Sequence, residues 1–106
     1  MEELNNYNIV MIKKMIYDYM VSVYGSKNIR KVYLFGSYAR GEENSNSDID
    51  LLIDVDDNFT LFDQAKFKEG IEDTFHKNAD VIIDEDLEGL FKENVYKERI
   101  CIYERT

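Results

Sequence analysis

Two aspartates one residue apart, Asp48 and Asp50, are the side chains of this sequence best placed to do chemistry. Asp48 precedes, and Asp50 lies within, a mostly apolar run, residues 49–53, that we expect to form a buried strand. Because side chains alternate between the two faces of a strand, both carboxylates should point the same way, roughly 7 Å apart at the backbone. Carboxylates held on one rigid edge can converge on hard cations such as Mg²⁺, which prefer oxygen ligands and often hold phosphate as well.

A glycine and a serine, Gly36 and Ser37, precede these aspartates and follow the apolar run 32–35. Glycine has no Cβ, so its backbone can approach a phosphate closely. Ser37 adds a hydroxyl, and its N–H is expected to begin a short helix over residues 38–40, whose amino terminus favours anions. The alternative is a simple tight turn. The position of the pair relative to the aspartates favours the phosphate-holding interpretation.

Arg40 has two interpretations that the residues do not separate. Its guanidinium could contact a phosphate, or it could form an ion pair with Glu42, Glu43 or an aspartate. The following stretch, residues 41–47, is polar and rich in turn-forming residues, which predicts a surface loop.

A third acid, Asp80, is expected to join the first two. Thr60 and Asp63 form a capping-box pattern ahead of a predicted helix over residues 61–76, and a short strand over 80–83 follows it. A strand–helix–strand unit returns the chain to the same sheet, which would bring Asp80 close to Asp48 and Asp50. The alternative is that Asp80 is simply an acidic residue at the start of a strand and binds no ligand.

The whole chain of 106 residues is expected to be one α/β (α+β) domain, with a small mixed sheet of three or four strands flanked by helices. Further helices are predicted over residues 6–24, with a stripe of Ile9, Ile12, Ile16, Tyr19 and Val23, and from the acidic segment 84–88 onward. Strands are predicted over 29–35 and, at the sheet edge, 100–103.

Other residues that could do chemistry have simpler explanations. Asp54 shares the predicted face of Asp50 but should lie at a solvent-facing strand end. His76, the single histidine, is expected to end a helix rather than bind a metal. Cys101, the single cysteine, cannot form an internal disulfide and is expected to be a small apolar residue.

The charge of the chain narrows the class of partner. The sequence has 22 acidic and 13 basic side chains, a net charge of −9, and two bound divalent cations would still leave −9 + 4 = −5. Such a surface repels nucleic-acid backbones, so the acceptor of any reaction should be a small molecule or a protein. No apolar run approaches the ~20 residues of a membrane span, and no secretion signal begins the chain, so we expect a cytoplasmic protein.

The spacing of Gly36-Ser37, ten residues, and Asp48-x-Asp50 resembles the signature of the DNA polymerase-β-like nucleotidyltransferases, and the short length resembles their minimal (MNT) members. The resemblance covers roughly residues 29–84. It implies the polymerase-β-like fold, with Gly36 and Ser37 holding the triphosphate of ATP, while Arg40 stays a candidate for contacting the same phosphates. Asp48 and Asp50 would bind two Mg²⁺ ions, with Mn²⁺ as an alternative. Asp80 would complete the coordination of the metal ion on the nucleophile side and could also accept the proton of the attacking hydroxyl.

The same resemblance implies a partner. Minimal nucleotidyltransferases are often paired, as antitoxins, with a helical ribonuclease toxin of the HEPN type, to whose tyrosine they transfer AMP. Two alternatives stay open at this point. One is transfer of AMP to a small molecule such as an aminoglycoside, for which larger relatives use a second domain. The other is a non-catalytic acidic module that masks a basic surface of a toxin.

Overall fold

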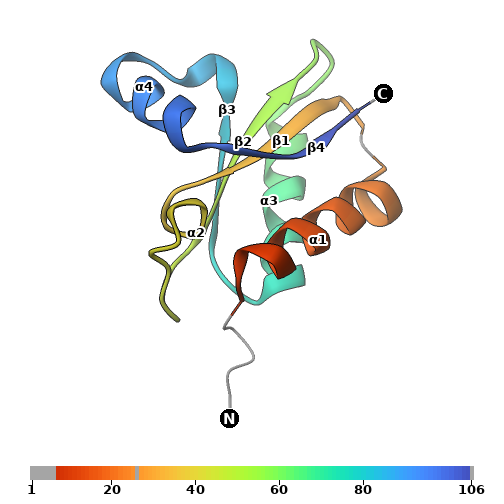
Figure 1. The fold of residues 1–106 in the computed structure, drawn as a ribbon. Coiled ribbons are helices and arrows are strands. Elements are labelled where there is room, and N and C mark those ends of the chain that lie inside the picture. The colour runs from red at the N-terminus through yellow and green to blue at the C-terminus, as the bar shows by residue number, and fades with distance from the viewer. Residues whose placement is uncertain (1–6, 26, 106) are drawn as a thin grey trace.

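The computed structural model describes residues 7–25 and 27–105. Its four strands form one mixed sheet in the order β3-β2-β1-β4, as Figure 1 shows. The strands are β1 (Ile29–Phe35), β2 (Ile49–Val55), β3 (Ala79–Ile83) and β4 (Ile100–Glu104). β1 pairs antiparallel with both β2 and β4, whereas β2 and β3 run parallel. The mixed sheet and all four predicted strands, including the edge strand at the carboxyl end, are confirmed.

Helices cover both faces of the sheet. α1 (Ile9–Tyr19) and α3 (Leu61–Phe75) lie on one face, and α4 (Gly89–Glu98) lies on the other (Figure 1). The short helix α2 (Ser37–Arg40) follows β1 after a single residue, Gly36, close to the predicted position. No helix within the described residues is both long enough and apolar enough to cross a membrane.

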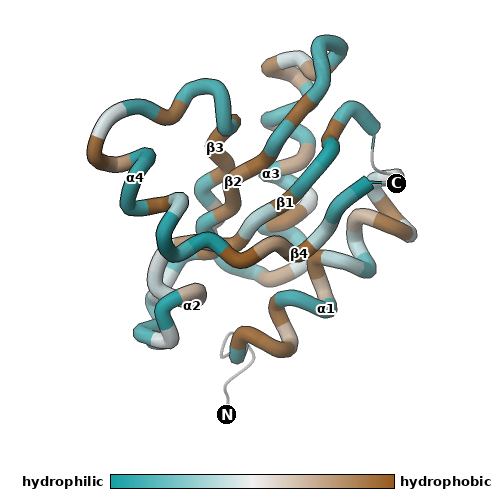
Figure 2. The backbone as a smooth tube through the Cα atoms, turned by 45° about the horizontal axis from the view of Figure 1, so that its top comes forward, coloured by the Kyte–Doolittle hydropathy of each residue, from teal (hydrophilic) through white to brown (hydrophobic). Residues whose placement is uncertain are grey.

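The two faces of β2 pack against different layers, and this alternation decides where the site lies. Ile49, Leu51 and Ile53 are fully buried in the main core with α1 and α3. Leu52 points to the opposite face, into a smaller apolar cluster beneath α4 with Phe35, Leu87 and Val95. In Figure 2 the apolar residues run along β2 and β3, between the helix layers. Since side chains two apart share a face, the residue two before Leu52, Asp50, belongs to the α4 side.

The first helix departs from the regular period that the sequence predicts. The α-helical part ends at Tyr19 and continues as a π-helical turn, η1 (Met20–Tyr24), before Gly25 stops it with a φ of 80°. Ile12 and Ile16 are buried as expected, and Met20 is buried as well. Val23, predicted on the same apolar stripe, is 72% exposed, because the wider π turn shifts the helix face away from the core. Residue 6, the predicted start, lies outside the described residues.

The third helix begins with the predicted capping box. The Thr60 hydroxyl accepts from the Asp63 N–H at 3.1 Å, and the Asp63 carboxylate accepts from the Thr60 N–H at 2.9 Å. His76 ends the helix in the left-handed conformation, with a φ of 56°. Leu61, the first residue of α3, is 79% exposed, because the buried surface of this helix begins only at Phe67.

The acidic segment 84–88 was expected to begin the last helix, and that prediction is wrong. Asp84–Asp86 form a separate 3₁₀ turn, η2, and α4 starts at Gly89. Leu87 lies between them in an extended conformation, 5% exposed, in the apolar cluster with Val95. Burial of this side chain against the sheet interrupts what charge patterning alone would continue as a helix.

Candidate active site

Asp50 and Asp80 lie opposite each other on neighbouring parallel strands. They are register partners of β2 and β3, so both side chains stand on the α4 side of the sheet. Asp80 is exposed, because β3 is an edge strand. The structure therefore places Asp80 beside Asp50, as the strand–helix–strand return predicts. Both aspartates line a cavity of about 380 Å³, whose other lining residues are Phe35, Gly36, Ser37, Arg40, Ile82, Phe91 and Glu98.

The electrostatics of this cavity favour a bound cation. The pKa of Asp50 is raised from 3.8 to about 6, mainly by burial and further by the charges of Asp80 and Asp48 and by a hydrogen bond to Asp80. The positive charge of Arg40 lowers the pKa of Asp50, but by less than the other causes raise it. A carboxylate whose pKa is raised by burial and by like charges is stabilised in its ionised form when a cation binds between them.

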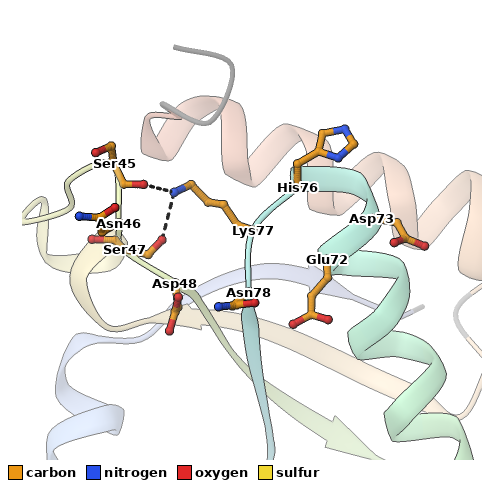
Figure 3. A pocket seen from close by; sticks show the side chains of 9 residues that line it. All are labelled: Ser45, Asn46, Ser47, Asp48, Glu72, Asp73, His76, Lys77 and Asn78. Atoms are coloured by element: carbon orange, nitrogen blue, oxygen red, sulfur yellow. Dashed lines mark hydrogen bonds between the residues drawn. The ribbon is translucent and has the colours of Figure 1, made fainter. Parts of the chain in front are cut away.

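Asp48 is not part of the strand that carries Asp50. It precedes β2, is exposed, and its charge still reaches Asp50 closely enough to raise the pKa of that carboxyl. Strand alternation alone therefore does not fix the direction of the Asp48 side chain, and the shared face expected for Asp48 and Asp50 stays a prediction. Asp48 lines a second, polar cavity of about 510 Å³, together with Ser45, Asn46, Ser47, Glu72, Asp73, His76, Lys77 and Asn78 (Figure 3).

The loop that carries Asp48 is tied to the end of α3. The Lys77 ammonium donates to the carbonyl oxygens of Ser45 at 2.8 Å and of Ser47 at 3.2 Å (Figure 3). Asp48 points away from Lys77 in the same view. The lysine thus positions the loop backbone without neutralising the Asp48 carboxylate directly.

The three predicted metal ligands do not form a ready-made ligand group. Over residues 7–25 and 27–105, no three or more His, Cys, Asp and Glu side chains are arranged to hold a metal ion. Asp50 and Asp80 supply a pair of carboxylates whose mutual repulsion a divalent cation would relieve. The residues present fit such an ion if the exposed Asp48 side chain turns toward the pair.

Gly36 makes the turn over Asp50 possible. It has a φ of 80° and a ψ of −157°, a conformation that residues with a side chain rarely adopt. A Cβ placed on Gly36 would stand 2.9 Å from Cγ of Asp50 and 3.1 Å from its Cβ. Glycine is therefore required both by the backbone conformation and by the contact with the carboxylate. Ser37 begins α2 next to it and lines the same cavity.

Glu98, which the sequence reasoning did not select, closes the site from α4. Its Oε2 accepts from the Gly36 N–H at 2.7 Å, and its carboxylate accepts from Nη1 of Arg40 at 3.1 and 3.2 Å. Arg40 also donates from Nε to Glu42 at 2.9 Å, so in this structure the arginine forms ion pairs. Glu98 lies 62 residues from Gly36, and no local pattern marks it.

The remaining residues considered from the sequence lie outside the cavity of Asp50. Asp54, on the same strand, accepts from Arg30 at 2.9 Å at the far end of β2. His76 lines the polar cavity beside Lys77 and is exposed. Cys101, expected to be a small apolar residue, is a free cysteine exposed on β4.

Residues 12–106 match the family described as Polymerase beta, Nucleotidyltransferase. The chain belongs to this family, and the predicted nucleotidyltransferase fold is confirmed. A candidate protein adenylyltransferase of Methanocaldococcus jannaschii, MJ0435, is 29% identical over 95 residues, which cover 90% of this chain and 98% of the relative. The protein adenylyltransferase MntA of Thermococcus cleftensis is 27% identical over 74 residues, covering 70% of this chain and 75% of the relative.

Solved structures show the same fold. A candidate minimal nucleotidyltransferase superimposes with a TM-score of 0.75 and 27% identity, covering 90% of this chain and 96% of that one. A toxin–antitoxin structure with AMP-PNP has a TM-score of 0.68 at 19% identity, covering 93% and 75% of the two chains. A structure of a tri-AMPylated Shewanella oneidensis HEPN toxin in complex with MNT antitoxin has a TM-score of 0.60 at 17% identity, covering 99% of this chain and 74% of that one. At these lower identities the last two show the fold alone.

Proposed function

We propose that this chain is a metal-dependent adenylyltransferase that transfers AMP from ATP to a protein. The family and the names of the two curated relatives support the reaction class. The structural observation that supports the proposal most is the pairing of Asp50 with Asp80 in the cavity that Gly36 also lines. Two carboxylates beside a turn that lacks a Cβ form a site where a polyphosphate and its cations can lie together.

Asp50 and Asp80 would hold the divalent cations, with Asp48 completing the set after a rotation of its exposed side chain. We propose two Mg²⁺ ions, with Mn²⁺ able to replace them. Such ions stabilise the charge that develops on the attacking and leaving oxygens of an in-line displacement.

The chain's own residues would bind and orient the reactants. The Gly36 N–H, the Ser37 hydroxyl and the Arg40 guanidinium are the donors of the cavity that can bind the phosphates of ATP. Asp80, exposed on the edge strand, can accept the proton of an acceptor hydroxyl that approaches from solvent. The hydroxyl oxygen then bonds to the α-phosphorus as the bond to the bridging oxygen breaks, and pyrophosphate leaves.

We propose a tyrosine of a HEPN-type toxin as the acceptor, which makes the chain a cytoplasmic antitoxin. The AMPylated HEPN toxin in complex with a structurally similar MNT antitoxin supports this assignment. The net charge of −9 also favours a protein over a nucleic-acid acceptor.

The proposal is tested by incubating the chain with α-labelled ATP and Mg²⁺ in the presence of the protein encoded by the neighbouring gene. Covalent label on that protein supports transfer of AMP to a protein. Label on an added aminoglycoside instead would assign the small-molecule reaction. Tight binding of the partner with no label would assign a non-catalytic masking role and contradict the proposal. Omission of Mg²⁺, with EDTA present, is the matched control.

A further inference from the structure

Glu98 occupies the hydrogen-bond donors that we assign to the phosphates of ATP. Its carboxylate takes the Gly36 N–H at 2.7 Å and Nη1 of Arg40 at 3.1 and 3.2 Å. Carboxylate and phosphate oxygens accept the same kind of hydrogen bond from an N–H or a guanidinium. A nucleotide phosphate and Glu98 therefore cannot both use these donors fully.

The charge in the cavity makes Glu98 an unfavourable neighbour for a polyphosphate. Among the described residues, the carboxylates of Asp50, Asp80 and Glu98 line the cavity together with a single basic side chain, Arg40. Divalent cations can neutralise the two aspartates, whereas Glu98 is bound to the arginine itself. The Glu98 charge would then lie beside the incoming phosphates and repel them unless its side chain leaves.

Packed neighbours on both sides hold the backbone around Glu98, so its carboxylate can leave the site by rotation of the side chain alone. Val95, one turn earlier in α4, is 1% exposed in the cluster beneath the helix. The next residue, Arg99, stacks on the rings of Tyr33 and Tyr96, at 4.3 and 3.9 Å from their centroids. The Glu98 side chain itself is 22% exposed, which leaves solvent for it to rotate into.

We propose that Glu98 is an autoinhibitory competitor for the phosphate-binding donors of Gly36 and Arg40, displaced by side-chain rotation when ATP binds. The inference rests on the proposed function, because it assumes that this cavity binds ATP. Glu98 then sets the affinity for the nucleotide: the empty site is closed by an internal carboxylate, and only a ligand with enough phosphate contacts opens it.

A purely structural tie between α4 and the turn at Gly36 predicts the opposite effect. If Glu98 only orients Arg40 and the turn, its removal should loosen the donors and weaken ATP binding. If Glu98 competes, its removal should strengthen ATP binding. The direction of the change in Kd separates the two roles.

The test measures the Kd of ATP by calorimetry, with Mg²⁺ present, for the wild type, Glu98→Gln, Glu98→Ala and Glu42→Gln. Glu42 accepts from Nε of the same guanidinium, whereas the Gly36 N–H donates to Glu98, so Glu42→Gln controls for loss of one charge beside Arg40. We expect both Glu98 variants to bind ATP about fivefold more tightly or better, and Glu42→Gln to stay within about twofold of the wild type. Thermal unfolding identifies any variant that fails to fold, and Glu98→Gln keeps the side-chain volume if Glu98→Ala does not fold.

An unchanged or weaker affinity in the folded Glu98 variants would overturn the competitor role, while AMP transfer by the wild type would leave the proposed function standing. Failure of every variant and of the wild type to bind ATP would overturn both. A second readout is the Gly36 amide resonance in ¹H–¹⁵N spectra. Adding inorganic pyrophosphate with Mg²⁺ should shift that resonance at lower concentration in Glu98→Gln than in the wild type.

Discussion

Gly36 lies directly against Asp50, so closely that a Cβ on the glycine would stand 2.9 Å from Cγ of the aspartate. The turn after β1 and the carboxylate on β2 therefore form one packed unit, although 14 positions separate them in the sequence (50 − 36). The glycine is needed for two independent reasons: its φ of 80° and the carboxylate beneath it.

Replacing Gly36 with alanine should therefore cost more stability than the same change at Gly41, which has a φ of 73° but no atom within 4 Å of a built Cβ. We expect about 1 kcal/mol for Gly41→Ala from the backbone conformation alone, and roughly 2 kcal/mol or more for Gly36→Ala, because the methyl group must also displace Asp50. Urea unfolding measures both values. Equal losses in the two variants would show that Asp50 yields to the methyl group without cost.

The raised pKa of Asp50 predicts how stability depends on pH in the absence of metal. The pKa of Asp50 rises from its ordinary value of 3.8 to about 6 in the folded chain, mainly because of burial. Folding therefore favours the protonated form of this carboxyl. The contribution of Asp50 to stability is then fully present below pH 3.8 and is lost as the pH rises through about 6.

Asp50→Asn should consequently raise the Tm at pH 7.5, and the gain should shrink at pH 5. We expect at most about 1 kcal/mol, since the group is partly exposed and solvent screens its interactions. Asp54→Asn is the control on the same strand, and it should give no such gain because Asp54 is paired with Arg30 at 2.9 Å. A lower Tm for Asp50→Asn than for the wild type at pH 7.5 would contradict the claim that the ionised Asp50 carboxylate destabilises the metal-free fold.

Mg²⁺ should stabilise the wild type, because a cation relieves the repulsion between Asp50 and Asp80. The increase in Tm at saturating Mg²⁺ should be larger at pH 7.5 than at pH 5, and EDTA should reverse it. Asp50→Asn should show little of the increase, whereas Asp54→Asn should retain it. An Mg²⁺ effect of equal size in both variants would place the bound ion elsewhere.

The packing of α4 against the sheet can be tested by replacing valine with alanine at one buried and one exposed helical position. Val95 is 1% exposed beneath α4, whereas Val10 on α1 is 72% exposed. Val95→Ala should cost about 1–3 kcal/mol, and Val10→Ala should stay within about 0.5 kcal/mol of the wild type. Similar small costs for both would mean that α4 is not held by this cluster.

Local patterns in the sequence were sufficient for much of this architecture. Alternation fixed the buried face of β2, and the strand–helix–strand return placed Asp80 beside Asp50. The Thr60 and Asp63 capping box also appears as predicted. Each of these depends on neighbours within one element or on one chain crossover, which is why periodicity and turn chemistry can reveal them.

The features that were missed depend on tertiary packing. The π turn exposes Val23, and burial of Leu87 splits the acidic segment from α4. Glu98 reaches Gly36 only because α4 packs over that end of the sheet, a contact between distant segments that no sequence spacing encodes.

The most direct test of the carboxylate pair is the initial rate of AMP transfer from α-labelled ATP to the partner protein by Asp50→Asn, Asp80→Asn and Asp54→Asn. All three remove one carboxylate charge, but only the first two belong to the cavity beside Gly36. We expect a loss of about 100-fold or more in Asp50→Asn and Asp80→Asn, and a rate close to that of the wild type in Asp54→Asn. Transfer at the wild-type rate by a folded Asp50→Asn or Asp80→Asn protein would contradict the assignment of the active site.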